Sequence, residues 1–175
     1  IGLDGGFAPW VGALIADVKQ PILLVTQEGR EEEAVTRLSR VGFDNTLGYL
    51  KGGFEAWHAA KKEVDTITSV EATELKDLLK NKSVSVFDVR KDTEYSSEHI
   101  PSAQNTPLSF LNNFLAEFPA KETFFVHCAG GYRSVIAASI LKSRGIHNLI
   151  DVAGGFKAIK DANIEVTDYV CPSTL

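Results

Sequence analysis

The chain has 175 residues, enough for one large domain or two small ones. Its apolar fraction of 44% is ordinary for a globular protein that buries a core. The net charge of −5 gives no reason to expect nucleic acid or an anionic membrane as a partner, and no apolar run is long enough for a membrane-spanning helix. Two cysteines cannot form a disulfide framework, so we expect a reducing, cytoplasmic compartment.

The first part of the chain is predicted to fold as a strand, a turn, a helix and a second strand. The expected ranges are residues 21–25, 26–30, 31–40 and 46–50. The segment Gly52-Gly53-Phe54-Glu55-Ala56-Trp57 follows the second strand. Strands that alternate with helices at this spacing indicate a parallel sheet that is covered on both faces.

The same order of elements recurs later in the chain. Gly154-Gly155-Phe156-Lys157-Ala158-Ile159 repeats the earlier glycine segment, and it follows a strand at 123–126, a loop, a helix at 134–144 and a strand at 149–152. An internal repeat of this kind indicates two domains of one fold. We place their boundary near Val64-Asp65, which gives domains of residues 1–64 and 65–175.

The second copy has further elements before its loop. A helix is expected to start near Ser69, and an apolar strand at 84–89 ends in Asp88-Val89-Arg90. Open α/β sheets place their sites at the carboxyl ends of strands. We therefore expect Asp88 and Arg90 to brace a functional loop, and the alternative is an exposed strand end of little energetic weight.

A reactive cysteine is predicted directly after the strand at 123–126. The cysteine loop consists of Cys128-Ala129-Gly130-Gly131-Tyr132-Arg133-Ser134 and leads into a helix. Backbone N–H groups at a helix N-terminus stabilise a thiolate and bind an anion, the glycines permit a tight turn, and Arg133 adds a positive charge. We interpret Cys128 as a nucleophile and residues 129–134 as its substrate-binding loop. The alternative is a buried cysteine on a tight turn.

Other candidate residues leave alternatives open. His127 could lower the pKa of the Cys128 thiol or could face away from it, and Tyr132 could contact a substrate or cover the neighbouring helix. Cys171 could relay sulfur or be a spectator thiol. The histidines are scattered, without the spacing of metal ligands, so we expect no metal site and no cofactor.

The cysteine loop resembles that of the rhodanese sulfurtransferases, Cys-x-x-Gly-x-Arg-Ser, through Cys128, Gly131, Arg133 and Ser134. Asp88-Val89-Arg90 resembles the Asp-x-Arg element of the same family. Residues 98–103 resemble its His-Ile-Pro-Gly-Ala signature, with Ser102 in place of the glycine. The related phosphatases use Cys-x5-Arg, a loop one residue longer. The resemblance implies sulfur transfer from a small persulfide or thiosulfate donor to a thiophilic acceptor through a persulfide on Cys128.

Two other functions stay open beside that interpretation. One is a non-catalytic rhodanese module that carries sulfur for a partner domain or binds it. The other is a phosphatase or arsenate reductase on the same fold, which the short loop disfavours.

The first copy lacks these features. We align Gln27 with Cys128, and the turn to the following helix is about two residues shorter. Glu31, Glu32 and Glu33 open that helix and would repel an anion. The resemblance therefore implies a tandem arrangement: an α/β protein of two rhodanese-like domains with parallel central sheets flanked by helices, the first inactive and truncated.

We also expect the chain to be part of a longer protein. It contains no methionine, and its first copy aligns only with the back half of the second. Residues 1–15 look similar to the first rhodanese region of bacterial fusion proteins, in which a metallo-β-lactamase-fold domain of the persulfide dioxygenase type comes first. That resemblance implies a metal-dependent partner domain upstream in the same protein.

Overall fold

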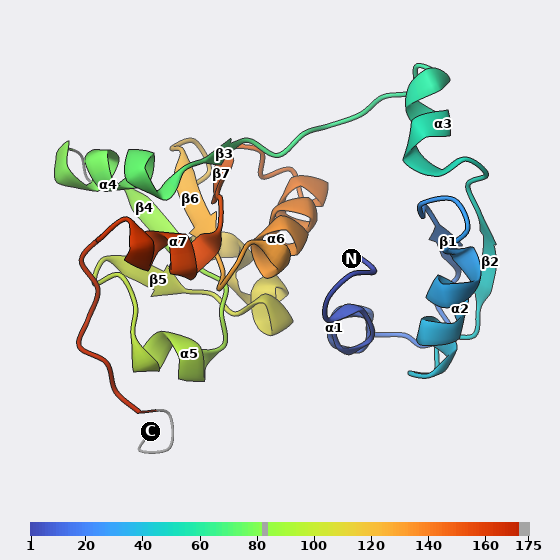
Figure 1. Ribbon diagram of the computed structural model, residues 1–175, viewed down its shortest axis with the longest axis horizontal. Coiled ribbons are helices and arrows are strands. Elements are labelled where there is room, and N and C mark those ends of the chain that lie inside the picture. Colours follow the sequence, from blue (N-terminus) through green and yellow to red (C-terminus); the bar gives the residue numbers. More distant parts are fainter. Residues whose placement is uncertain (82–83, 172–175) are drawn as a thin grey trace. The chain divides into compact units, whose positions relative to one another are not determined.

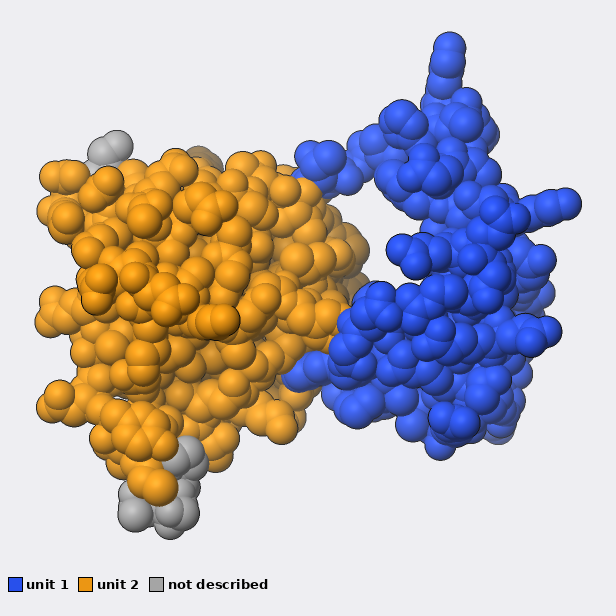
Figure 2. Space-filling view, in the orientation of Figure 1, with its two compact units in different colours: residues 1–66 blue, residues 67–175 orange. Residues whose placement is uncertain are grey.

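The computed structural model describes residues 1–81 and 84–171. The chain forms two compact units, residues 1–66 and residues 67–175 (Figure 2). The division between them falls after Thr66, close to the expected boundary at Val64-Asp65. The last four residues of the expected second domain, 172–175, lie outside the described residues.

Unit 2 is built on a five-stranded parallel sheet with the strand order β3-β7-β6-β4-β5 (Figure 1). The strands are β3 (Ser69–Val70), β4 (Ser85–Asp88), β5 (Ala103–Asn105), β6 (Phe124–His127) and β7 (Leu149–Val152). The helices are α4 (Ala72–Asn81), α5 (Asp92–Ser97), the 3₁₀ segment η1 (Leu108–Glu117), α6 (Tyr132–Ser143) and α7 (Gly155–Asp161). The expected α/β class with a parallel sheet flanked by helices is confirmed for this unit.

Helices cover both faces of the unit 2 sheet, which explains why its central strand is apolar throughout. On one face, α4 and α7 pack on the sheet through Leu75, Ile159 and their neighbours. On the other face, Phe87, Phe118 and Phe124 form an aromatic cluster with ring centroids 4.6–5.3 Å apart. Every residue of β6 is buried, as expected for the middle of a parallel sheet.

The start of the first helix in unit 2 was predicted wrongly. Ser69 does not begin a helix. Ser69 and Val70 form the edge strand β3 beside Asp151 and Val152, and the helix begins at Ala72. The backbone groups of Thr68 and Val70 accept hydrogen bonds from β7, and this pairing outweighs the local helical pattern.

Unit 1 is a smaller α/β layer. It has a parallel pair, β1 (Ile22–Leu24) and β2 (Thr46–Tyr49), with helices α1 (Phe7–Leu14), α2 (Glu31–Ser39) and α3 (Gly53–Ala59). Its core lies between α1, α2 and β1 and consists of Phe7, Val11, Leu24, Ala34, Leu38 and Phe43. No helix in the described part of the chain is long and apolar enough to cross a membrane.

The strand pairing of the two units has the same register at the carboxyl ends of the strands, although β1 has a register shift between Ile22 and Leu23. Leu24 pairs with Tyr49 in unit 1, and Val126 pairs with Asp151 in unit 2. Gly53 and Gly155 hold equivalent places after these strands. In both, φ is positive, and a Cβ atom would clash with a backbone oxygen, that of Thr26 in unit 1 and that of Cys128 in unit 2.

This register corrects the alignment of the first copy. Because Leu24 matches Val126, the residue that occupies the place of Cys128 is Thr26 and not Gln27. The buried helix residues Leu38 and Leu141 are also equivalent. The carbonyl of each accepts a hydrogen bond from the amide five residues later, that of Phe43 in unit 1 and that of Ile146 in unit 2. Leu38 lies 12 positions after Thr26 and Leu141 lies 13 after Cys128, so the first turn is one residue shorter rather than two.

One face of the unit 1 sheet is open where the equivalent face of unit 2 is covered. The exposed fractions of its apolar side chains run from 41% to 74% for Leu23, Val25, Phe54 and Trp57. Those of their counterparts in unit 2 are no more than 8%, for Phe125, His127, Phe156 and Ile159. In unit 2 that face lies under α4 and α7.

Candidate active site

The Cys128 sulfur lies at the N-terminus of helix α6. Cys128 follows β6 directly and is 1% exposed. The amide of Gly131 donates a hydrogen bond to Sγ at 3.2 Å, and Sγ lies 3.6 Å from the Ser134 hydroxyl. Gly131 has a φ of 101° and precedes the first turn of α6, where free N–H groups favour an anion. The geometry thus favours a sulfur anion at this position.

The glycine segment after β7 fixes the backbone of the cysteine loop. The amide of Phe156 donates to the Cys128 carbonyl at 2.6 Å, and that of Lys157 donates to the Ala129 carbonyl at 3.1 Å. Gly155 passes so close to Cys128 that a side chain there would clash with the loop backbone. The second Gly-Gly-Phe segment therefore contacts the cysteine loop and holds its backbone in place.

Asp88 and Arg90 lie behind the cysteine loop as a buried ion pair. The Arg90 guanidinium is 2.6 Å from Asp88 Oδ2, and Arg90 also donates to the Glu98 carbonyl at 2.8 Å. The central carbon of its guanidinium group, Cζ, lies 3.7 Å from the centre of the Phe156 ring. The amide of Phe156 in turn donates to the Cys128 carbonyl, so Arg90 contacts a residue that is bound to the loop.

Arg133 does not offer a free charge to a substrate. Its guanidinium makes two hydrogen bonds to the carboxylate of Glu94 on α5, at 2.5 and 2.8 Å. These bonds hold the pKa of Glu94 below its usual range and raise the pKa of Arg133. From the sequence, Arg133 was expected to add positive charge to the loop; in the structure this charge is paired with that of Glu94. No spacing rule links Glu94 to Arg133, which lies 39 residues away, so the sequence did not reveal this pair.

His127 is part of the core behind the loop. Its ring is buried, lies 3.8 Å from Asp88 Oδ2 and stacks near Phe156 with centroids 6.1 Å apart. Burial lowers the pKa of His127 despite the nearby carboxylate of Asp88, so the imidazole is neutral near pH 7. These contacts favour a packing role over an acid role.

The remaining loop residues lie at the surface rim. Ala129, Gly131 and Tyr132 are half-buried and Gly130 is exposed. Cys171 is exposed near the end of the described chain. Among the described residues, no group of three or more potential metal ligands is close enough to hold an ion.

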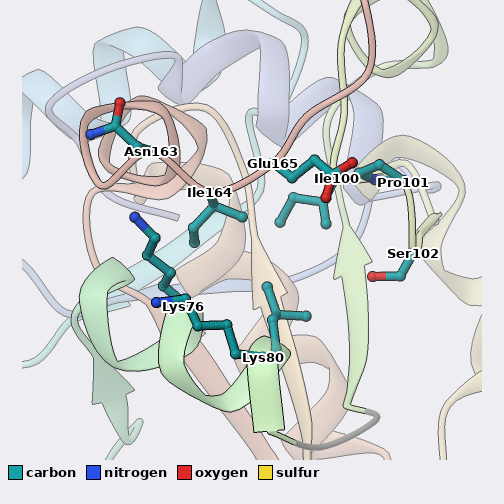
Figure 3. A pocket seen from close by; sticks show the side chains of 9 residues that line it. Lys76, Lys80, Ile100, Pro101, Ser102, Asn163, Ile164 and Glu165 are labelled. Atoms are coloured by element: carbon teal, nitrogen blue, oxygen red, sulfur yellow. The ribbon is translucent and has the colours of Figure 1, made fainter.

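A cavity of about 480 Å³ lies elsewhere in unit 2 and does not include the cysteine loop (Figure 3). Its walls come from the end of α4, the turn before β5 and the segment after α7, and its lining residues are Lys76, Leu79, Lys80, Ile100, Pro101, Ser102, Asn163, Ile164 and Glu165. It opens toward the amino ends of the strands, whereas Cys128 follows the carboxyl end of β6. The buried Cys128 is thus not among the residues that line this cavity.

The fold and the site define a domain with a cysteine at the helix-opening turn of a parallel sheet. Residues 71–162 match the family model of the rhodanese-like domain, and the chain belongs to that family. The crystal structure of a rhodanese-like domain protein from Staphylococcus aureus is 33% identical with a TM-score of 0.53, over 58% of this chain and 100% of that one.

Several curated relatives carry names that refer to sulfur. The adenylyltransferase and sulfurtransferase uba4 of Ogataea parapolymorpha is 29% identical over 103 residues, 58% of this chain and 26% of that protein. The putative sulfur carrier protein YrkF of Bacillus subtilis is 30% identical over 77 residues, 44% of this chain and 42% of that protein. The chain therefore spans less than half the length of these relatives.

Proposed function

We propose that unit 2 is a sulfurtransferase with Cys128 as its nucleophile. The observation that carries the proposal is the Gly131 N–H aimed at Cys128 Sγ at the start of α6. The thiolate attacks the outer sulfur of a donor, the donor S–S bond breaks, and the donor leaves as a thiolate or as sulfite. The outer sulfur of the Cys128 persulfide then passes to a thiophilic acceptor, and the thiolate is regenerated.

The paired charge of Arg133 favours a persulfide over thiosulfate as the donor. Thiosulfate carries two negative charges, and the loop holds no net cation because Glu94 balances Arg133. The reacting persulfide group carries a single charge and needs less compensation in the loop, because the other charges of such a donor lie away from its outer sulfur. Glutathione persulfide is therefore expected to give the higher kcat/KM, and a higher value for thiosulfate would contradict this preference.

A replacement of the nucleophile tests the proposal directly. Cys128→Ser keeps the size of the side chain and the backbone of the loop, but a hydroxyl cannot form a persulfide. We expect sulfur transfer to cyanide to fall by at least about a thousandfold, as for other lost nucleophiles. Cys171→Ser is the matched control and should keep its activity. Near-normal turnover by Cys128→Ser would overturn the mechanism.

A carrier module is the second candidate, and the similarity to the sulfur carrier YrkF supports it. A carrier would accept one sulfur atom on Cys128 and hand it to a partner protein without turning over small acceptors. A single burst of persulfide formation, followed by no thiocyanate with excess cyanide, would favour the carrier.

A phosphatase or arsenate reductase is the weaker alternative. Arg133 comes five positions after Cys128, one position earlier than in the longer phosphatase loop, and its guanidinium is turned to Glu94. An aryl phosphate should therefore not be hydrolysed above background.

We further propose that unit 1 corresponds to the back half of an inactive rhodanese-like domain. Three observations support this assignment: the pairing of Leu24 with Tyr49 matches that in unit 2, Gly53 and Gly155 make equivalent close contacts, and one apolar face of unit 1 is exposed. The proposed tandem arrangement predicts that a segment like α4 covers that face and that a strand like β4 pairs with β1. Whether a metallo-β-lactamase-fold domain precedes it in the same protein stays a prediction, and the sequence of the encoding gene tests it.

A further inference from the structure

We propose that the cavity at the amino ends of the unit 2 strands binds a small zwitterion of the dipeptide type with apolar side chains. The cavity holds about 480 Å³, which lies within the usual range of small-molecule sites. The inference does not depend on the proposed chemistry of Cys128, because the cysteine loop is not among the residues that line this cavity.

The floor of the cavity is apolar. Ile100 and Ile164 are 2% and 7% exposed, and both belong to the core cluster of unit 2, against which Leu79 packs. Pro101 continues the apolar surface beside Ile100 (Figure 3). Apolar side chains of a ligand are removed from water when they lie on this floor, which favours binding.

Two lysines lie on the α4 side of the cavity. Lys76 and Lys80 are four positions apart, so they share one face of the helix. The ammonium group of Lys76 donates to the Ala162 carbonyl at 2.7 Å and keeps two further N–H donors. The ammonium group of Lys80 lies 3.6 Å from Asp77 Oδ1 in an exposed pair, which costs little to open. This side of the cavity therefore suits a carboxylate.

Hydrogen-bond acceptors lie on the other side of the cavity. Figure 3 shows Glu165 and Ser102 on the side away from the two lysines. Glu165 is the only acid among the described lining residues, and it has no ion pair within the described part of the chain. Ser102 adds a hydroxyl at the place where the family signature has glycine. An ammonium group of a ligand can donate to both side chains.

A ligand with charges of both signs fits this arrangement better than a simple anion. The carboxyl ends of α4 and α7 border the cavity, and their partial negative charge opposes a bare anion, as does Glu165. A dipeptide has its carboxylate at one end, its ammonium group at the other end and its side chains between them. A single amino acid carries both charges on one carbon atom and cannot separate them in this way.

Hydrogen bonds hold the walls of the cavity together. Lys76 joins α4 to the end of α7, and the amide of Thr167 donates to the His99 carbonyl at 2.8 Å, which joins the segment after α7 to the turn before β5. The Tyr95 hydroxyl donates to the Ala103 carbonyl at 2.6 Å at the end of that turn. A site that is formed before binding loses little free energy to ordering.

The test is an NMR titration of the ¹⁵N-labelled full chain, 19.0 kDa, with the dipeptide Leu-Leu. We expect saturable shifts of the amides of the lining residues. N-acetyl-Leu-Leu lacks the ammonium group and Leu-Leu amide lacks the carboxylate, so each should bind about two- to fivefold more weakly, the weight of an exposed ion pair. The proposal is overturned if millimolar Leu-Leu gives no saturable shifts, if the shifts lie on the open face of unit 1, or if either derivative binds as tightly as Leu-Leu.

Three variants match each protein group to its partner on the ligand. Lys80→Gln should weaken the binding of Leu-Leu about two- to fivefold but not that of Leu-Leu amide, and Glu165→Gln should weaken Leu-Leu equally but not N-acetyl-Leu-Leu. Ser102→Gly restores the signature residue and should weaken Leu-Leu by a similar factor. All three side chains are exposed, so the variants should fold.

The control for these variants is Lys121→Gln, which removes an exposed positive charge outside the cavity and should leave Leu-Leu binding unchanged. Equal losses for the charged and the blocked ligands in Lys80→Gln and Glu165→Gln would overturn the assignment of the two sides. Because no sulfur donor is present in the titration, its result is separate from that of the sulfur-transfer assay.

Discussion

The guanidinium of Arg133 is bound in a two-pronged ion pair by the carboxylate of Glu94, with nitrogen–oxygen distances of 2.5 and 2.8 Å. This pair joins the first turn of α6 to α5 and so fixes the direction in which the cysteine loop leaves β6. Two parallel hydrogen bonds to a planar guanidinium give both strength and direction. Arg133 therefore links α6 to α5, and the carboxylate of Glu94 balances its charge.

Removal of the Glu94 charge should change donor preference. In Glu94→Gln, Arg133 keeps its positive charge without a balancing anion, so the dianion thiosulfate gains more than a singly charged persulfide. We expect the ratio of kcat/KM for thiosulfate to that for glutathione persulfide to rise roughly three- to tenfold. Glu98→Gln, which loses an ion pair to Lys160, is the control and should leave the ratio unchanged. An unchanged ratio in Glu94→Gln would show that Arg133 has no influence on the donor.

The same pair should appear in the pH dependence of stability. Arg133 holds the pKa of Glu94 below its ordinary value of 4.5 in the folded chain. A lowered folded-state pKa means that the pair stabilises the fold above the unfolded value and that this stabilisation is lost as pH falls through the folded one. The free energy of unfolding should thus decrease below about pH 4.5, and less steeply in Glu94→Gln. Urea unfolding at pH 3 to 6 measures it, and equal slopes for both proteins would be the contrary result.

The sequence was informative where a short motif determines a local geometry. The cysteine loop, the buried strand before it and the Gly-Gly-Phe segment were all found, because turn glycines and apolar runs are local signals. The direction of the Arg133 side chain was not, since its partner Glu94 depends on how α5 packs beside α6. The burial of Asp151 on β7 was not predicted either, because a single acidic residue in a short strand shows no pattern until the strands around it are paired.

The alignment of the first copy shows a second limit of the sequence. Without the strand register, the position of the gap in the alignment of the two copies is not determined by the sequence. Gln27 was therefore aligned with Cys128, whereas the strand register matches Thr26 with it. Likewise, the predicted helix was started near Ser69 because a helical pattern follows it, although Ser69 and Val70 pair with β7 as a strand. Long-range pairing decided both cases.

Arg90 should be irreplaceable by lysine. Its planar group reaches Asp88, the Glu98 carbonyl and the face of Phe156 together, and a lysine ammonium cannot make all three contacts. Because the Asp88 carboxylate is fully buried, we expect Arg90→Lys to lower the free energy of unfolding by about 2–3 kcal/mol. Urea unfolding with an unchanged m-value measures the loss. The exposed Arg144→Lys is the control, and a loss below about 0.5 kcal/mol in Arg90→Lys would contradict the bracing role.

Thr26→Cys should not create a second active site. The strand register places Thr26 where unit 2 has Cys128, so this variant tests the correct position, and Gln27→Cys is its neighbour control. The turn after Thr26 is one residue shorter, and the helix that follows opens with Glu31, Glu32 and Glu33, whereas α6 opens with Tyr132, Arg133 and Ser134. Arg30, near the start of that helix, is held by Asp4 and Glu33. A persulfide there would lie near the carboxylates of Glu31 and Glu32, while the charge of Glu33 is balanced by Arg30 and Arg37. Both variants, built on Cys128→Ser, should give no thiocyanate above background from glutathione persulfide and cyanide. Turnover by Thr26→Cys alone would mean that the shorter turn still encloses a persulfide, and that the first unit lacks only its nucleophile.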